Sequence, residues 1–200
     1  MSIRFARRRH RTVLALALAA TASLAACQSP GTDMILSDYI APTYNPTLLN
    51  AAARYDAVPV EVVGNPFGGD PAALAEVVAE SVRETPLASQ IPFQPATEAM
   101  GAPYRLVVIF DAARSQGFAS VCSRGSRRRA DTAGPGLRMM MTYCLGSQTI
   151  TSLRLRHGGF DTTEGPDTPA FRRLVQNATA ALFPPRTEIR GNSGDGDGFF

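Results

Sequence analysis

Lysine is absent from this chain, and all 20 of its basic residues are arginines. The absence bears on residues 64–70, a loop between a predicted strand and a predicted helix, where phosphate-binding loops are found. This loop has no lysine, no G-x-G-x-x-G spacing, and no serine or threonine to reach magnesium. We therefore expect an ordinary turn that places Asp70 at the start of the helix.

Long hydrophobic runs are also lacking. The uncharged stretch of residues 12–26 has 15 residues, whereas spanning hydrocarbon takes roughly 20. No later run approaches that length. The stretch follows a positively charged segment with no acidic residue, and it ends in small residues before a cysteine, Leu24-Ala25-Ala26-Cys27. The arginines of the positive segment are Arg4, Arg7, Arg8, Arg9 and Arg11. This order is typical of a processed secretory signal.

The Leu24-Ala25-Ala26-Cys27 sequence resembles the lipobox of bacterial lipoproteins. The resemblance implies cleavage between Ala26 and Cys27, a diacylglycerol thioether on Cys27, and acylation of the new amino group, for example by palmitate. In that family an aspartate after the cysteine retains the protein in the inner membrane. Gln28 stands there in this chain, which implies the outer membrane of a Gram-negative host, with the protein facing the periplasm. Two alternatives stay open: a retained membrane helix, and an ordinary signal peptide followed by a coincidental cysteine.

Removal of residues 1–26 changes the charge of the chain. The formal charge of the whole chain is +3, but the removed segment holds five arginines and no acid. The remaining 174 residues carry 15 arginines against 17 acidic residues, a charge of −2. The apparent basicity belongs to the signal segment, so we expect no nucleic-acid partner. Two or more acyl chains would anchor the protein stably on a membrane.

Histidine and cysteine are scarce after this cleavage. His157 is then the single histidine, and the chain has no G-x-S-x-G sequence. Cys122 and Cys144 are the cysteines that remain, and we expect them to form a disulfide in an oxidising compartment. Two unpaired buried thiols are the alternative. Zinc sites built from cysteine and histidine need about four ligands, which is more than the remaining histidine and two cysteines supply. We predict no catalytic site, no metal and no cofactor apart from the lipid on Cys27.

Capping residues followed by proline predict three helices. Asn45-Pro46 opens a short one over residues 46–54, Asp70-Pro71 a longer one to about Arg83, and Thr168-Pro169 one that Pro184-Pro185 ends. In the last helix, Arg172 and Arg173 are expected on the outer face. The apolar stripes of the two longer helices must pack against a sheet or another helix.

Four strands are predicted over residues 58–63, 104–110, 138–145 and 149–156. The second is apolar throughout, which is typical of a central strand. Gly146-Ser147-Gln148 predicts a hairpin between the last two, and the alternation of Arg154 and Arg156 with leucines favours an outer position for the final strand. We expect an α+β fold, a two-layer sandwich in which a mixed four-stranded sheet carries two longer helices on one face. Residues 27–44 are expected to form a flexible tether, 45–186 a single domain, and 187–200 a disordered tail.

Five arginines and one acidic residue, Asp131, lie between the two cysteines of the predicted disulfide. The arginines are Arg124, Arg127, Arg128, Arg129 and Arg138. Arginine presents a planar fork of donors that suits phosphate and carboxylate. This segment is a candidate anion-binding patch, and a solvated loop is the alternative. Met139-Met140-Met141 is expected to fill the core, with Met140 on the face opposite its neighbours.

Three functions are consistent with these features. A non-catalytic binding or assembly module with a partner in the envelope is preferred, because no catalytic constellation stands out. A module that docks on anionic lipid or cell wall through residues 124–138 is the second. An unrecognised periplasmic enzyme is the third.

Overall fold

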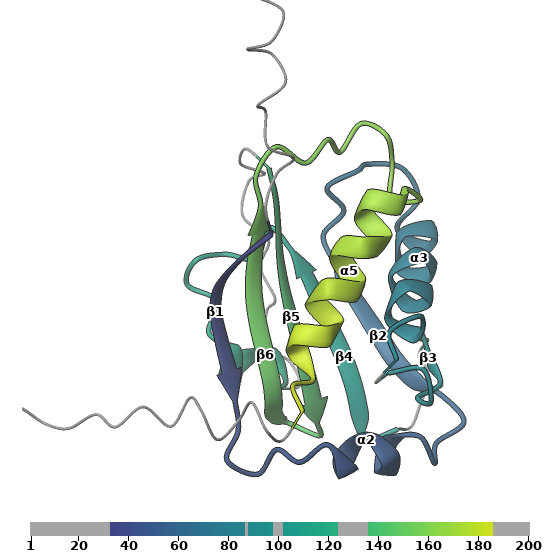
Figure 1. Ribbon diagram of the computed structural model, residues 1–200, viewed down its shortest axis with the longest axis vertical. Coiled ribbons are helices and arrows are strands. Elements are labelled where there is room, and N and C mark those ends of the chain that lie inside the picture. Colours follow the sequence, from purple (N-terminus) through teal and green to yellow (C-terminus); the bar gives the residue numbers. More distant parts are fainter. Residues whose placement is uncertain (1–32, 87, 98–101, 124–135, 186–200) are drawn as a thin grey trace, which may run out of the picture. The chain divides into compact units, whose positions relative to one another are not determined.

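The computed structural model describes residues 33–86, 88–97, 102–123 and 136–185 (Figure 1). Among these residues, six strands form one mixed sheet in the order β1-β6-β5-β4-β2-β3. The strands are β1 (Asp33–Ile40), β2 (Val58–Val63), β3 (Phe93–Pro95), β4 (Tyr104–Phe110), β5 (Leu137–Leu145) and β6 (Gln148–His157). The four predicted strands are present within one residue of their expected ends.

The predicted number of four strands was wrong, because β1 and β3 add one strand at each edge of the sheet. β1 lies within the segment that we expected to be a flexible tether, and it pairs antiparallel with β6. As a result β6 is an inner strand and not an outer one. Seven of the eight residues of β1 are exposed, so its side chains leave no burial pattern in the sequence. β3 has only three residues, which is too short for a periodic signal.

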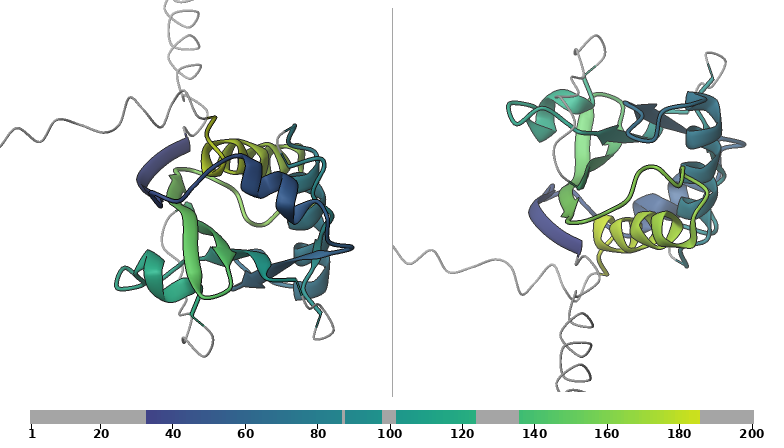
Figure 2. Two further views of the ribbon diagram at one scale, coloured as in Figure 1. Left: turned by 90° about the horizontal axis from the view of Figure 1, so that it is seen from below. Right: turned by 90° about the horizontal axis from the view of Figure 1, so that it is seen from above.

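Two longer helices pack on one face of this sheet, as predicted (Figures 1 and 2). They are α3 (Pro71–Arg83) and α5 (Pro169–Leu182). The Asp70 carboxylate accepts a hydrogen bond from the Ala72 amide at 2.9 Å, and the Thr168 hydroxyl accepts one from the Phe171 amide at 3.2 Å. These caps satisfy backbone donors that the first helical turn leaves without partners. Two shorter helices are α2 (Thr47–Ala52) and α4 (Phe118–Val121).

The order of the strands follows from the connections between them. β2 and β4 are parallel, and the connection between them runs through α3 and the short strand β3; the expected strand–helix–strand unit is present with one added edge strand. β4 pairs antiparallel with β5, and β5 with β6, so the predicted hairpin is confirmed. No helix among the described residues is both long enough and apolar enough to cross a membrane.

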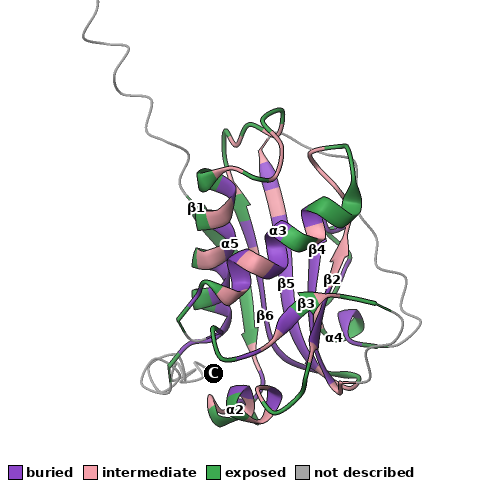
Figure 3. Cartoon of the chain, turned by 90° about the vertical axis from the view of Figure 1, so that its right-hand side faces the viewer, coloured by how far each residue is buried: buried purple, intermediate pink, exposed green. Residues whose placement is uncertain are grey.

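The sheet separates two hydrophobic clusters. The larger one lies between the sheet and helices α3 and α5, and it includes Met139 and Met141. Met140 belongs to the smaller cluster on the other face, with Val107, Ile109 and Val121. The alternation of the three methionines between the faces is therefore confirmed. All seven residues of β4 are buried, in agreement with its expected central position (Figure 3).

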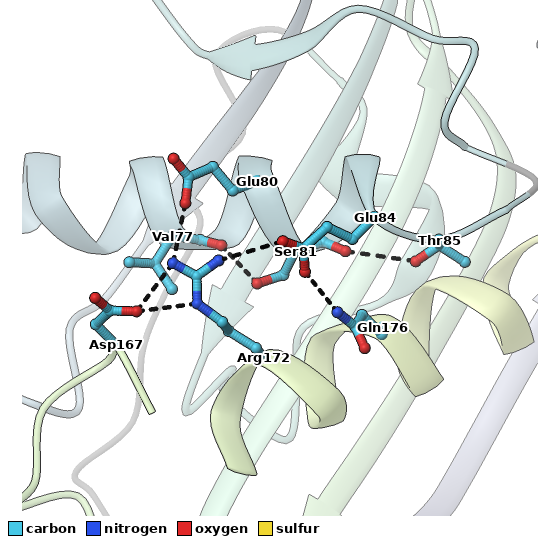
Figure 4. A network of polar contacts seen from close by, with 8 residues as sticks. All are labelled: Val77, Glu80, Ser81, Glu84, Thr85, Asp167, Arg172 and Gln176. Carbon is cyan, nitrogen blue, oxygen red and sulfur yellow. Dashed lines mark hydrogen bonds and ion pairs between the residues drawn. The ribbon is translucent and has the colours of Figure 1, made fainter. Parts of the chain in front are cut away.

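Arg172 connects the two longer helices at the surface; it is partly exposed and Arg173 is exposed, as expected for residues outside the core. From α5 its guanidinium contacts Glu80 on α3 at 3.0 Å and Asp167 at 2.9 Å (Figure 4). These hydrogen bonds raise the pKa of Arg172. The Gln176 amide donates to Glu84 at 2.7 Å, one turn further along both helices. Because the acidic partners are largely exposed, the network stabilises the helix pair by no more than about 1 kcal/mol per contact.

Two buried tyrosines differ in how their hydroxyl groups are satisfied. The Tyr44 hydroxyl donates to the carbonyl of Pro184 at 3.1 Å. The Tyr143 hydroxyl is buried and has no hydrogen-bond partner among the described residues. Burial raises the pKa of Tyr44 from 10.0 to about 12. It raises the pKa of Tyr143 further, with smaller contributions from Tyr104 and Tyr44.

We expect Tyr143→Phe to leave the free energy of unfolding at pH 7 unchanged or to raise it by up to about 1 kcal/mol, because it removes an unsatisfied buried donor. Tyr44→Phe should lower it by about 1 kcal/mol. Since the folded state holds both phenolic protons more tightly than the unfolded chain, stability should fall as pH rises above 10, and less steeply in either variant. Urea unfolding at pH 7 and at pH 9–11 measures both effects. A larger loss at pH 7 for Tyr143→Phe than for Tyr44→Phe would contradict the assignment.

Candidate functional site

The arginine patch predicted from the sequence is only partly visible. Arg124, Arg127, Arg128 and Arg129 lie outside the described residues. Arg138 lies near the start of β5, and its Nε donates to the Asp111 carboxylate at 3.2 Å. The structure thus places Arg138 in the sheet, whereas the positions of the other four arginines lie outside what it describes.

Arg138 instead lies beside arginines that the prediction did not include. In the antiparallel pairing of β5 and β6, Arg138 is opposite Arg156 and Met140 is opposite Arg154. Residues two apart on a strand share a face, so Arg138, Arg154 and Arg156 all project from the face opposite α3 and α5. Arg114, in the segment after β4, lies near the same end of the sheet.

These four arginines line a pocket of about 340 Å³ together with Leu36 and Ala112; Met139 also borders it, although its side chain packs in the cluster on the other face. Four guanidinium groups make the lining strongly basic, and the Asp111 carboxylate is paired with one of them, Arg138. The volume is at the lower end of the range for small-molecule sites. A concave, positively charged surface with an apolar wall is suited to an anion that carries an apolar part.

Contacts with two neighbouring residues hold the Arg154 side chain in place. Its Nη2 donates to the carbonyl of Gln116 at 2.7 Å, and its guanidinium lies 5.9 Å from the centre of the Phe118 ring. Its Nε is buried and has no acceptor among the described residues. Side chains held in advance lose less conformational entropy when a ligand binds. Arg154 therefore has a fixed position and an Nε donor to which a ligand could bind.

The segment after β4 shapes the near side of this pocket. Asp111 has a positive φ of 48°, a conformation that residues other than glycine seldom adopt. Its amide donates to the carbonyl of Arg138 at 2.9 Å while its carboxylate accepts from the Arg138 side chain at 3.2 Å. The two contacts hold the end of β4 against the start of β5. Ala112 and Arg114 are thereby placed in the pocket wall.

A disulfide holds the same connecting segment to the sheet further along. The sulfurs of Cys122 and Cys144 are 2.00 Å apart, and the Cα atoms 5.6 Å. Arg105 donates to the carbonyl of Cys122, and the Thr149 hydroxyl donates to the carbonyl of Phe118 at 2.9 Å. These contacts position α4, whose first residue, Phe118, supports Arg154.

His157 lies at the end of β6, and its contacts are structural ones. Its Nδ1 is 2.6 Å from the Asp33 carboxylate at the start of β1, and its ring is 5.4 Å from that of Phe160. The Asn177 amide on α5 donates to the other oxygen of Asp33 at 3.2 Å. His157 thus helps to attach β1 to the rest of the domain. Within the described ranges, no group of three or more metal-ligating side chains of the histidine, cysteine and acidic types occurs.

Sequence reasoning missed Arg114, Arg154 and Arg156 as site residues. The alternation of Arg154 and Arg156 with leucines did show that both point away from the core. It did not show that β1 lies on the outer side of β6, which turns an exposed row of arginines into the lining of a pocket.

A scan of protein-family models finds no match to this chain, and a search of curated proteins finds none either. Among solved structures, a PelC dodecamer from Paraburkholderia phytofirmans is similar over 78% of this chain and 100% of its own, with 13% identity and a TM-score of 0.42. A single-substitution variant of that PelC covers 76% of this chain and 94% of its own, with 14% identity and a TM-score of 0.36. Scores this low carry no argument about the function of this chain.

Proposed function

We propose that this protein is a lipid-anchored lipoprotein of the cell envelope that faces the periplasm and acts as a non-catalytic binding or assembly module. The proposed localisation rests on the lipobox-like sequence that ends at Cys27 and on Gln28 after it. The binding role rests on one structural observation, the pocket lined by four arginines.

The chemistry of that pocket supports binding over catalysis. A guanidinium group keeps its proton at any physiological pH, so it serves as a donor and a positive charge but not as a general base. His157, which would be the best candidate for a base, is not among the residues that line this pocket. Arg154 is fixed by Gln116 and Phe118. These features favour recognition of an anion without its conversion.

The alternative that uses residues 124–138 for docking rests on the clustering of arginines in the sequence. Of its five arginines, Arg138 is the one that lies in the described part of the chain, and its Nε is paired with Asp111. The structure therefore bears on one residue of this alternative, which otherwise rests on the sequence.

The anchor can be tested by expressing the chain with its own signal sequence in a Gram-negative host fed an alkyne analogue of palmitate. We expect the wild type to be labelled and to fractionate with the outer membrane, and Cys27→Ala to lose the label completely. Gln28→Asp should keep the label and move to the inner membrane. Label that persists in Cys27→Ala would refute the anchor.

The binding role can be tested separately by cross-linking intact cells and purifying the wild-type protein from solubilised membranes. We expect a reproducible envelope partner or bound anionic ligand, which Arg154→Gln should weaken. Recovery of the protein with neither would contradict a binding module.

A further inference from the structure

We propose that the pocket formed by Arg114, Arg138, Arg154 and Arg156 binds the phosphate group of an anionic membrane lipid. The inference deepens the proposed function, because the lipid would belong to the membrane on which Cys27 is anchored. It names the ligand class and the residues that recognise it.

The charge and the donors of the pocket select an oxyanion. Four guanidinium groups from two paired strands and the segment after β4 converge on one pocket. Each guanidinium presents parallel N–H groups that match two oxygens of a phosphate, and such charge-assisted hydrogen bonds are roughly twice as strong as neutral ones. Arg154 contributes a fixed position and a buried Nε without an acceptor among the described residues.

The apolar side of the pocket distinguishes a lipid from a free phosphate ion. Leu36 lines the pocket and is 49% exposed. It is the residue at which the pairing of β1 with β6 shifts register. Met34 and Ile35 beside it are 60% and 52% exposed. Met34 lies opposite Arg156 and shares the face of the pocket, whereas Ile35 lies opposite Leu155 and belongs to the other face. Exposed apolar side chains such as Leu36 and Met34 beside a cationic pocket would have no use for a small hydrated anion, but they suit the acyl part of a lipid.

The length of chain between the anchor and β1 limits how far this rim can lie from the membrane. Asp33, the first residue of β1, follows Cys27 by six positions. Six residues span at most about 22 Å when fully extended. The apolar residues at the start of β1 therefore stay within reach of the lipid surface, where phosphate groups lie next to apolar chains.

The test uses the full lipoprotein, purified from membranes in a non-ionic detergent, so that the protein keeps its own processing. Dihexanoyl phosphatidic acid, inorganic phosphate and dihexanoyl phosphatidylcholine are titrated as soluble probes by isothermal calorimetry. These short-chain lipids avoid the contribution of the anchor to vesicle binding. We expect phosphatidic acid to bind at least tenfold more tightly than inorganic phosphate, and phosphatidylcholine to bind at least tenfold more weakly than phosphatidic acid.

Two sets of variants separate the cationic and apolar parts of the site. Arg114→Gln with Arg156→Gln should weaken phosphatidic acid at least tenfold, whereas Arg54→Gln with Arg173→Gln removes the same charge from exposed positions elsewhere and should leave affinity unchanged. Leu36→Ser should weaken phosphatidic acid and leave inorganic phosphate unaffected. Thermal unfolding of each variant confirms that the fold is retained.

Three results would overturn the proposal. Equal affinity for inorganic phosphate and phosphatidic acid would assign the pocket to a free phosphate ion. An equal loss of affinity for phosphatidic acid in both double-arginine variants would show that only the overall charge matters. Absence of binding by both phosphatidic acid and inorganic phosphate would exclude a phosphate ligand for the pocket. Failure of palmitate labelling at Cys27 would remove the anchor while leaving the calorimetric result intact, so the two failures can be told apart.

Discussion

Replacement of Phe171 by alanine should lower the free energy of unfolding by about 3–5 kcal/mol, the largest single-residue effect that we expect. The Phe171 side chain is fully buried on the inner face of α5. Its ring lies 4.8 Å from that of Phe67 and 5.9 Å from that of Phe110. Alanine would leave a cavity between the helix and the sheet, because the rigid strand β4 cannot move in to fill it.

An exposed aromatic residue supplies the matched control for this cavity. Tyr55 is 40% exposed and contacts Tyr104 edge-on at 5.8 Å. Tyr55→Ala should cost less than about 1.5 kcal/mol. Urea unfolding followed by circular dichroism measures both variants. If Phe171→Ala cost no more than Tyr55→Ala, the packing of α5 on the sheet described above would be wrong.

Loss of the Cys122–Cys144 disulfide should destabilise the folded domain by about 3 kcal/mol. The bond joins residues 22 positions apart, and most of its effect comes from restricting the unfolded chain. We expect reductant to lower the free energy of unfolding of the wild type by about this amount. The double variant Cys122→Ala/Cys144→Ala should be unaffected by reductant.

The same bond should also influence the arginine pocket. Cys122 follows α4 directly, and Phe118 at the start of α4 contacts the Arg154 guanidinium. Reduction should therefore weaken the binding of phosphatidic acid by the wild type more than it weakens any residual binding by Arg154→Gln. Identical behaviour of the oxidised and reduced wild type in both assays would show that the disulfide contributes neither stability nor order to the site.

Local signals predicted most of the fold. The helix starts at Asp70-Pro71 and Thr168-Pro169 were legible because capping and the restricted backbone of proline act within a few residues. The strand of residues 104–110 was legible because burial on both faces requires an uninterrupted apolar run. β1 could not be recognised in this way, because backbone pairing with β6 creates it and most of its side chains remain exposed.

The arginine site could not be predicted from patterns along the sequence, for a related reason. Clustering along the sequence directed attention to residues 124–138, while Arg114, Arg138, Arg154 and Arg156 are spread over three segments. The register of β5 against β6 sets Arg138 opposite Arg156, and register is a property of two strands together. The spacing of residues within either strand alone therefore cannot reveal this register.

The sequence alone determined which segments form the central strands and the two long helices, since these depend on interactions between residues close along the chain. It also carries the lipobox-like signal at Cys27, on which the proposed address depends. Only the tertiary structure decided that residues 33–40 extend the sheet and that four arginines share one pocket with Leu36. Both outcomes depend on strand pairing between distant residues, whose free energy comes from contacts that form when the chain folds.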